Sequence, residues 1–257
     1  MLQQERFHRI QALLSQLQRL STERVMSELN ISRETARRDI IELEALGLAK
    51  RVHGGIISIE PTSEAPLTIR TTQRAKEKRA IARTAIQQLS AGQTVFIDSG
   101  STTSIVAEEL RTLSGLTIIT NSLHVVMNLT MAMETETLNH EIILLGGRVH
   151  QRPQTQGDLV IREIYRYKAD IALLSPVGVC PQHGISSFYT EEANIAQAMV
   201  QQSQKVIVLA DHSKLDITSR VQYATAQEIA LLITDQQAKQ QIALAKYKHA
   251  FSEVVFA

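Results

Sequence analysis

The 257-residue sequence has one cysteine, no tryptophan and almost no net charge. The single Cys180 excludes an internal disulfide and fits a reducing compartment. A formal net charge of +1 means that any basic surface has to be local. No apolar run approaches the roughly 18 residues that span a bilayer, and the charged N-terminus lacks the apolar core of an export signal. These absences predict a cytoplasmic protein with no membrane partner.

Few side chains suit a metal ion. Cys180 and His183 are close in sequence and are two candidate metal ligands, but no second group of such residues accompanies them. We therefore expect no metal site and no cofactor. Hydrophobic residues make up 44% of the chain and charged residues 21%, which is typical of a globular protein with one large or two modest domains.

Three helices are predicted near the N-terminus. Apolar residues at helical spacing indicate a first helix over residues 2–18. A second helix fits residues 22–29, and Ser32 caps a third over residues 33–46, which Gly47 ends. The short turn between the second and third helices is typical of a helix-turn-helix.

The third helix has two different faces. At about 100° per residue, Ala36, Ile40 and Leu43 share one side, which suits a core. The arginines on the other side are Arg33, Arg37 and Arg38. Arginine can pair bidentately with guanine or hold phosphates, so this face predicts a contact with the DNA major groove. The alternative is a solvated charged face, because residues 1–60 as a whole are not strongly basic.

A β-hairpin is predicted directly after the third helix. Residues 48–52 and 56–59 form its strands, and two glycines form its tip. In this position a hairpin is the wing of a winged helix, and its basic residues would lie along the DNA backbone. Those residues are Lys50, Arg51 and His53. The alternative is a hairpin turn without a partner.

The natural domain boundary follows the hairpin. Residues 60–73 are predicted as a linker, because the segment contains Pro61 and Pro66 and its first part shows no periodicity. The chain therefore divides into a first domain of residues 1–59, the linker, and a second domain of residues 74–257.

Helices and strands alternate through the second domain. A helix begins near Thr72, with Lys78 among its exposed positions. Short apolar runs predict buried strands at residues 94–98, 116–120, 141–145, 171–174, 205–210, 229–233 and 253–256. Helical stretches lie between most of them, at residues 102–110, 122–133, 159–167, 191–202 and 236–247. This alternation predicts an α/β domain with a mainly parallel sheet.

The turn after the first of these strands has the composition of an anion site. Asp98 ends the strand, Gly100 lets the backbone approach a ligand, and hydroxyl side chains open the next helix. Those side chains belong to Ser101, Thr102 and Thr103. A helix N-terminus offers unpaired N–H groups and a partial positive charge to an anion. We expect this turn to hold a phosphorylated small molecule; the alternative is an ordinary turn and helix cap.

Polar residues also follow the other strands of the predicted sheet. Ligands of parallel α/β sheets bind beyond the carboxyl ends of the strands, so these residues should gather at one edge. They include Asn121, Ser122, Gly147, Arg148 and Lys214. Each is weak evidence by itself, because serine caps helices, glycine makes turns and basic side chains are often solvated. Together they favour a ligand that is a phosphorylated polyol.

Several short motifs occur along the chain in an order and spacing that can be compared with those of known protein families. They are Ser32-Arg-Glu-Thr35-Ala-Arg37-Arg38-Asp39, Arg51-Val-His53-Gly54-Gly55, Asp98-Ser-Gly-Ser-Thr-Thr103, Thr120-Asn-Ser122, Gly146-Gly147, Glu191-Glu192-Ala193 and Ala210-Asp-His-Ser-Lys214. Over nearly the whole chain, this pattern resembles the DeoR-type (DeoR/GlpR) family of transcriptional repressors.

The resemblance implies an N-terminal winged helix-turn-helix DNA-binding domain, followed by a mainly parallel α/β effector-binding domain similar to ribose-5-phosphate isomerase. It implies a homodimer or homotetramer that represses a carbohydrate-catabolism operon and that a phosphorylated sugar releases from double-stranded operator DNA. The residues expected to contact DNA are Ser32, Arg33, Thr35, Arg37, Arg38, Arg51, His53 and Gly54. The residues expected to contact the effector are Asp98, Gly100, Ser101, Thr102, Thr103, Asn121, Ser122, Gly147, Arg148, Glu192 and Lys214.

One segment departs from the family pattern. After the fourth strand, the isomerase and many family members carry an Asp-Gly-x-Asp-like step, where this chain has Ser175-Pro176-Val177-Gly178. Isomerisation needs a base that removes a proton next to a carbonyl, so we expect no catalytic residues and no enzyme. The alternatives are a sugar-phosphate isomerase-like enzyme that carries a DNA-binding domain, and a winged helix that only mediates assembly. The sequence does not distinguish a repressor from an activator, and it does not name the sugar, the operator or the operon.

Overall fold

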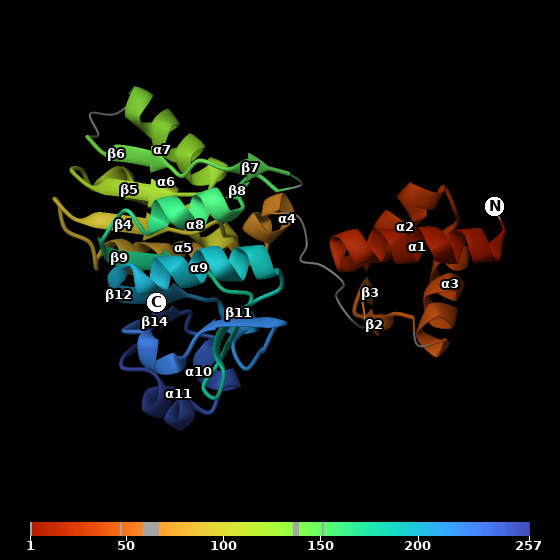
Figure 1. The fold of residues 1–257 in the computed structure, drawn as a ribbon. Coiled ribbons are helices and arrows are strands. Elements are labelled where there is room, and N and C mark those ends of the chain that lie inside the picture. Colours follow the sequence, from red (N-terminus) through yellow and green to blue (C-terminus); the bar gives the residue numbers. More distant parts are fainter. Residues whose placement is uncertain (1, 47, 59–66, 136–138, 151) are drawn as a thin grey trace. The chain divides into compact units, whose positions relative to one another are not determined.

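The computed structural model describes residues 2–46, 48–58, 67–135, 139–150 and 152–257. It separates the chain into two compact units, Met1–Arg70 and Thr71–Ala257, which we call unit 1 and unit 2 (Figure 1). The helix end predicted at Gly47 and most of the predicted linker, residues 60–66, lie outside the described residues. The domain limits 1–59 and 74–257 stay a prediction.

Over the described residues 2–46 and 48–58, unit 1 forms three helices and a three-stranded antiparallel sheet. Its elements are α1 (Gln3–Leu17), β1 (Arg19–Ser21), α2 (Thr22–Leu29), α3 (Arg33–Ala45), β2 (Lys50–Val52) and β3 (Gly55–Ile57). The hairpin β2–β3 was predicted, and its strands are shorter than expected. Strand β1 was not predicted; it pairs with β3, so the sheet order is β1-β3-β2.

The helices of unit 1 enclose one small core. The apolar face predicted for α3 is confirmed, because its Ala36, Ile40 and Leu43 are buried. They pack in a cluster with residues of the other elements, including Ile10, Leu14, Leu20, Val25 and Ile56. The arginines of α3 are exposed, as the helical period predicts.

One buried charge on α3 is neutralised from α1. The Asp39 side chain is 1% exposed, and the Arg6 guanidinium donates to it twice, at 2.6 Å from Nε to Oδ2 and 2.8 Å from Nη2 to Oδ1. This hydrogen bond is the main cause that raises the pKa of Arg6 above its ordinary value. A bidentate pair of this kind fixes the position of α3 against α1.

Arg6→Ala should therefore destabilise unit 1, because it leaves a buried carboxylate without its partner. Loss of one member of a buried pair costs about 3–5 kcal/mol, and the part-exposed Arg6 favours the lower end, about 3 kcal/mol. Urea unfolding of the full chain, followed by circular dichroism, measures this loss. The exposed Arg9→Ala on the same helix is the matched control; equal stability of the two variants would contradict the account.

Unit 2 is built on a seven-stranded sheet whose paired strands are all parallel. The strands are β4 (Thr94–Ile97), β5 (Thr117–Thr120), β6 (Glu141–Leu144), β9 (Ala169–Leu174), β12 (Ser203–Leu209), β14 (Leu231–Thr234) and β15 (Val254–Phe256). Each corresponds to a predicted apolar run. Their order across the sheet is β15-β14-β12-β9-β4-β5-β6.

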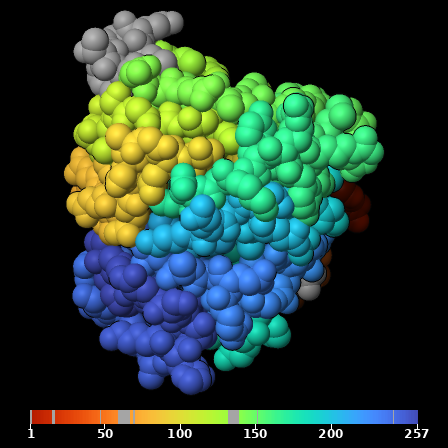
Figure 2. Space-filling model, turned by 60° about the vertical axis from the view of Figure 1, so that its left-hand side comes forward, coloured from red at the N-terminus to blue at the C-terminus, as the bar shows by residue number. Residues whose placement is uncertain are grey.

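Helices cover both faces of this sheet (Figure 1). They are α5 (Ala75–Ile86), α6 (Ser101–Glu109), α7 (Leu123–Thr135), α8 (Asp158–Ile164), α9 (Thr190–Gln201), α10 (Ala238–Gln241) and α11 (Leu244–Ala250), while the short α4 (Leu67–Thr72) crosses the limit between the units. One core cluster joins the sheet to α5, α6 and α7, and the other joins it to α8, α9 and α11. The space-filling view shows the yellow, green and blue segments of unit 2 in close contact (Figure 2).

Two predictions about these helices were wrong. The helix expected over residues 236–247 is two helices, because Ile242 takes an extended backbone and packs against the core. Lys78, expected on an exposed face, is 3% exposed. Its ammonium group donates to the Gln73 carbonyl at 2.8 Å, which satisfies the buried charge in part.

Short strands that the sequence did not predict add two small sheets to unit 2. Strands β7 (Arg148–Val149) and β8 (Thr155–Gln156) form a hairpin, and β10 (Gly178–Cys180), β11 (Gly184–Ser187) and β13 (Val221–Ala224) form an antiparallel sheet. Tyr247 ties α11 to β10, since its hydroxyl donates to the Val179 carbonyl at 3.2 Å. Burial raises the pKa of Tyr247, so the hydroxyl stays protonated. Among the described residues, no helix combines the length and the apolar character that a membrane span requires.

Candidate functional sites

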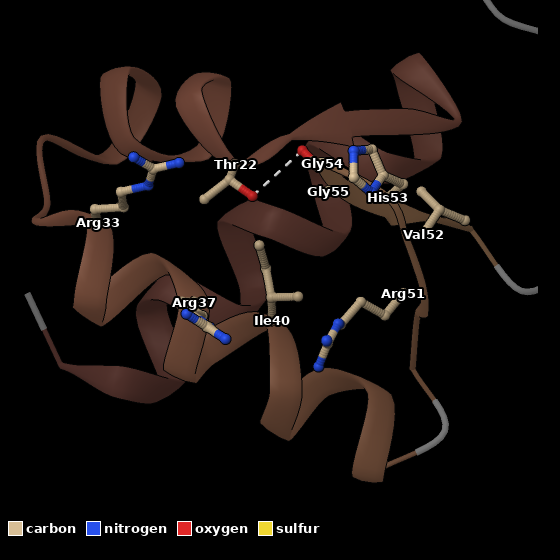
Figure 3. Close-up of a pocket in the computed structure, with 9 residues that line it drawn as sticks. All are labelled: Thr22, Arg33, Arg37, Ile40, Arg51, Val52, His53, Gly54 and Gly55. Atoms are coloured by element: carbon tan, nitrogen blue, oxygen red, sulfur yellow. Dashed lines mark hydrogen bonds between the residues drawn. The ribbon is translucent and has the colours of Figure 1, made fainter.

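Four basic side chains of unit 1 line a hollow between α3 and the β2–β3 hairpin: Arg33, Arg37, Arg51 and His53. Its volume is about 260 Å³. The residues that line it are Thr22, Arg33, Arg37, Ile40, Arg51, Val52, His53, Gly54 and Gly55 (Figure 3). The figure shows the guanidinium groups of Arg33, Arg37 and Arg51 around one opening. Three cationic groups at one concave surface make an anion-binding surface.

Short-range contacts hold this hollow in shape. Gly54 has φ +81°, a conformation that side chains disfavour, which explains glycine at the hairpin tip. Its carbonyl accepts from the Thr22 N–H at 2.9 Å and from the Thr22 hydroxyl at 3.3 Å, so α2 fixes the tip. The Arg51 N–H donates to Glu44 at 2.9 Å, which ties the first strand of the hairpin to α3.

The predicted DNA-binding residues fall into three groups. Those that line the hollow are Arg33, Arg37, Arg51, His53 and Gly54. Ser32 and Thr35 instead shape the start of α3: Ser32 Oγ accepts from the Thr35 N–H at 3.2 Å and lies 2.8 Å from its hydroxyl. Arg38 is exposed on α3 outside the lining. All remain candidates for a DNA contact, since each lies on α3, at its cap or on the hairpin.

In unit 2, the predicted phosphate turn follows β4, at the point where the order of the strands across the sheet reverses. Successive strands run outward from β4 to β6 on one side and from β9 to β15 on the other, so the reversal lies between β4 and β9. Open α/β sheets bind ligands outside the carboxyl ends of the strands at this point. Asp98 follows β4 and Ser175 follows β9, and the Ser175 N–H donates to Asp98 Oδ2 at 2.7 Å.

The turn itself is a tight helix start. Gly100 precedes α6, and its N–H donates to Thr103 Oγ1 at 2.8 Å. A Cβ on Gly100 would lie 2.7 Å from the Cβ of Ser175, so only glycine fits between the two loops. Ser101 and Thr102 are buried residues in the same turn, and neither hydroxyl forms a hydrogen bond with another described residue. Both are donors available to a ligand at the N-terminus of α6.

The end of β5 lies beside the β7–β8 hairpin. Asn121 exchanges hydrogen bonds with Thr155: its carbonyl accepts from the Thr155 N–H at 2.8 Å, and its Nδ2 donates to the Thr155 carbonyl at 3.1 Å. Ser122 forms a β-bridge with Gln154. Asn121 Oδ1 is buried without a hydrogen-bond partner among the described residues, which leaves an acceptor unsatisfied at the carboxyl end of β5.

Some predicted effector residues lie farther from the turn. Gly147 and Arg148 follow β6, and Lys214 lies in the short 3-10 helix His212–Lys214 after β12. In the sheet order, β6 and β12 are each two strands from β4, on opposite sides. The structure thus brings Asp98, Gly100 and the hydroxyl residues together, flanked by Asn121 and Ser122, and leaves Arg148 and Lys214 at the margins.

Three residues of unit 2 that contact predicted effector residues were not themselves predicted: Ser175, Arg152 and Gln154. The Ser175 N–H donates to Asp98, and Arg152 and Gln154 donate to Glu192 in the first turn of α9. Of these residues, Asp98 and Glu192 are predicted effector contacts, and both stay predictions. The sequence could have indicated Ser175, because it directly follows the strand predicted at residues 171–174. Arg152 and Gln154 lie in a loop with no periodicity, so only the fold reveals their contact with α9. In the part of the chain that the structure describes, no three His, Cys, Asp or Glu side chains gather as a metal site would require.

Two family models match the chain. The DeoR-like helix-turn-helix domain matches residues 6–62, and the DeoR C terminal sensor domain matches residues 73–236. The chain is similar to the HTH-type transcriptional repressor GlcR of Bacillus subtilis, with 37% identity over 239 residues that cover 91% of this chain and 89% of that protein. It is also 30% identical to the glycerol-3-phosphate regulon repressor of Escherichia coli over 236 residues, which cover 91% and 92% of the two chains.

A solved structure gives a more distant likeness. D-ribose-5-phosphate isomerase in complex with phospho-erythronic acid covers 55% of this chain and 54% of its own, with a TM-score of 0.40 and 15% identity. So weak a likeness carries no inference about activity. The family models and the named relatives confirm the resemblance expected from the motifs. The chain belongs to the DeoR family of transcriptional regulators, with a DNA-binding helix-turn-helix domain and a sensor domain.

Proposed function

We propose that the protein represses a carbohydrate-catabolism operon and that a phosphorylated sugar releases it from its operator. The observation that carries the ligand class is the start of α6, where the Ser101 and Thr102 residues are buried and their hydroxyls form no hydrogen bond with another residue that the structure describes. Helix N–H groups of the first turn have no intrahelical acceptor, and with these hydroxyls they form an anion cradle. The Escherichia coli relative is named for a glycerol-3-phosphate regulon, which agrees with a phosphorylated ligand.

The proposed DNA-binding surface is the hollow of unit 1. Arg33 and Arg37 on α3 would enter the major groove, while Arg51 and His53 on the hairpin would contact the DNA backbone. The effector would control DNA binding through linkage. If it binds more tightly to the conformation that binds DNA weakly, it shifts the population toward that conformation. A coupling free energy of about 1–3 kcal/mol lowers operator affinity by about 5- to 150-fold.

We propose a binding role, without catalysis, for unit 2. Isomerisation needs a base that is available to the substrate. Asp98 already accepts from the Ser175 N–H, and Glu192 already accepts from the Arg152 guanidinium and the Gln154 amide. The segment after β9 supplies serine and proline where the isomerase pattern has acids. The relatives are named as transcriptional repressors, which favours the same conclusion.

The partners proposed for this protein are double-stranded operator DNA and a second copy of the chain, in the cytoplasm. Helix-turn-helix dimers bind half-sites about one helical turn apart. A homodimer, or a homotetramer of two dimers, would therefore match a palindromic operator.

A thermal-shift screen of the full chain tests the ligand class. At a concentration 100 times its Kd, a ligand stabilises a protein by about 2.7 kcal/mol, which raises the Tm of a chain of this size by about 5–10 °C. We expect such a shift with at least one sugar phosphate and none with the matching unphosphorylated sugar. Equal shifts with both forms, or no shift with any ester, would overturn the proposal.

A further inference from the structure

A second group of polar side chains in unit 2 lies beside Ser122, which follows β5 and bridges to Gln154. Glu192 Oε1 accepts from Arg152 Nη1 at 2.7 Å and from Gln154 Nε2 at 2.9 Å, and Glu192 Oε2 accepts from the Ser187 hydroxyl at 3.3 Å. We call Arg152, Gln154, Ser187 and Glu192 the polar cluster. Its members come from the β7–β8 loop, the end of β11 and the first turn of α9, so the fold alone brings them together.

The polar cluster is ordered but still accessible. The Arg152 and Glu192 side chains are 22% and 17% exposed. The Arg152 Cζ lies 4.0 Å from the centre of the Tyr189 ring, and this stacking holds the guanidinium in place while the side chain keeps part of its surface exposed. An ion pair fixed by hydrogen bonds and stacking at a partly exposed position is prearranged for a polar ligand.

The position of the polar cluster relates it to the phosphate turn. Gln154 bridges to Ser122 at the end of β5. Ser187 ends β11, and β11 is bonded to the segment after β9, where the Val177 N–H donates to the Ser186 carbonyl at 3.0 Å. In the sheet order, β5 and β9 are the two neighbours of β4. The polar cluster is thus tied to the strand ends on both sides of the turn that begins at Asp98.

We propose that the polar cluster recognises the part of the effector remote from its phosphate, and that Arg152 is a specificity-determining residue; this rests on the proposed function. A guanidinium beside a carboxylate presents donors and acceptors together, which suits adjacent hydroxyl groups of a sugar or polyol. The ligand class is then a phosphorylated polyol with at least two neighbouring hydroxyls. A site that hydrogen-bonds such a group rejects an analogue that lacks it by up to about 10⁴-fold.

Calorimetric titration of the full chain tests this inference. The probes are ribose 5-phosphate, glucose 6-phosphate, their 2-deoxy forms and inorganic phosphate. We expect the wild-type protein to prefer at least one ester over its 2-deoxy form by about tenfold or more. In Arg152→Ala this preference should fall to within about twofold, while the Kd for inorganic phosphate stays unchanged, because the polar cluster does not hold the phosphate.

Matched variants separate recognition from packing. Arg166→Ala removes an exposed arginine of unit 2 and should leave every Kd unchanged. Arg152→Lys keeps the charge without the planar fork, so it should restore part of the preference. Ser187→Ala removes only the 3.3 Å hydrogen bond to Glu192, so it should reduce the hydroxyl preference less than Arg152→Ala does. It replaces Arg152→Ala in the test if that variant does not fold.

The possible outcomes distinguish a failure of the role proposed for Arg152 from a failure of the proposed sugar-phosphate effector. An Arg152→Ala protein that retains the hydroxyl preference overturns the inference and leaves the proposed function intact. Weaker binding of inorganic phosphate by the same variant overturns it as well, by making Arg152 a phosphate ligand. A wild-type protein that binds the esters and their 2-deoxy forms equally also overturns it. A wild-type protein that binds none of these esters refutes the proposed effector class, and the inference falls with it.

Discussion

Arg37→Ala combined with Arg38→Ala should abolish specific operator binding and leave the fold and the oligomeric state unchanged. Both side chains are exposed on α3, opposite the buried Ala36 and Ile40, so their loss removes no core contact. A bidentate arginine contributes about 1–3 kcal/mol to base discrimination, so two should weaken binding by about 30-fold to 10⁴-fold. Fluorescence anisotropy on a duplex selected by the wild-type protein from random DNA measures the change.

The matched control removes the same charge elsewhere in unit 1. Arg9→Ala with Arg24→Ala takes two exposed arginines from α1 and α2. Its effect should be small and dependent on salt, because only long-range attraction is lost. If the control weakened operator binding as much as the α3 variant, α3 would not be the recognition helix. Of the single variants, Arg37→Ala should have the larger effect, since Arg37 lines the hollow and Arg38 does not.

Ser101→Ala combined with Thr102→Val should produce a protein that binds its operator but no longer releases it. Each hydroxyl would donate a hydrogen bond to a charged phosphate, and such a bond contributes about 1.5–3 kcal/mol. Loss of both raises the effector concentration needed for release by about 100-fold or more. A titration of the protein–operator complex with the most stabilising ester, followed by anisotropy, gives this concentration directly.

Thr130→Val is the control for this variant. The exposed Thr130 hydroxyl on α7 already donates to the Val126 carbonyl at 2.9 Å, so we expect no contact between it and the effector. Release should be normal in the control. Normal release in the Ser101 and Thr102 variant as well would show that the start of α6 is not the phosphate site.

The sequence predicted the elements whose pattern is local. The 3.6-residue period separated the buried Ala36 and Ile40 from the exposed Arg37, and apolar runs located the seven strands of the large sheet. It did not predict β1, β7 or β8, because two or three residues are too short to show a period. It also misplaced Lys78, whose burial depends on an acceptor, the Gln73 carbonyl, that no pattern reveals.

The candidate effector site was predictable only in part. The Asp98–Thr103 turn has a local signature of glycine and hydroxyl residues, and it lies where the sequence suggested. The reversal of strand order between β4 and β9 comes from the pairing of strands, which the sequence does not give. The contact between Arg152 and Glu192 joins positions 40 residues apart, so it emerges only when the chain is folded.

The most direct test of the central claim is the affinity of the full-length protein for its operator duplex at fixed salt, with and without a sugar phosphate that binds it. The ester should lower operator affinity by about 5- to 150-fold. The unphosphorylated sugar should leave the affinity unchanged, and so should the ester with the Ser101 and Thr102 variant. Operator affinity that is unaffected by every ester that binds the protein, or lowered equally by the unphosphorylated sugar, would contradict the central claim.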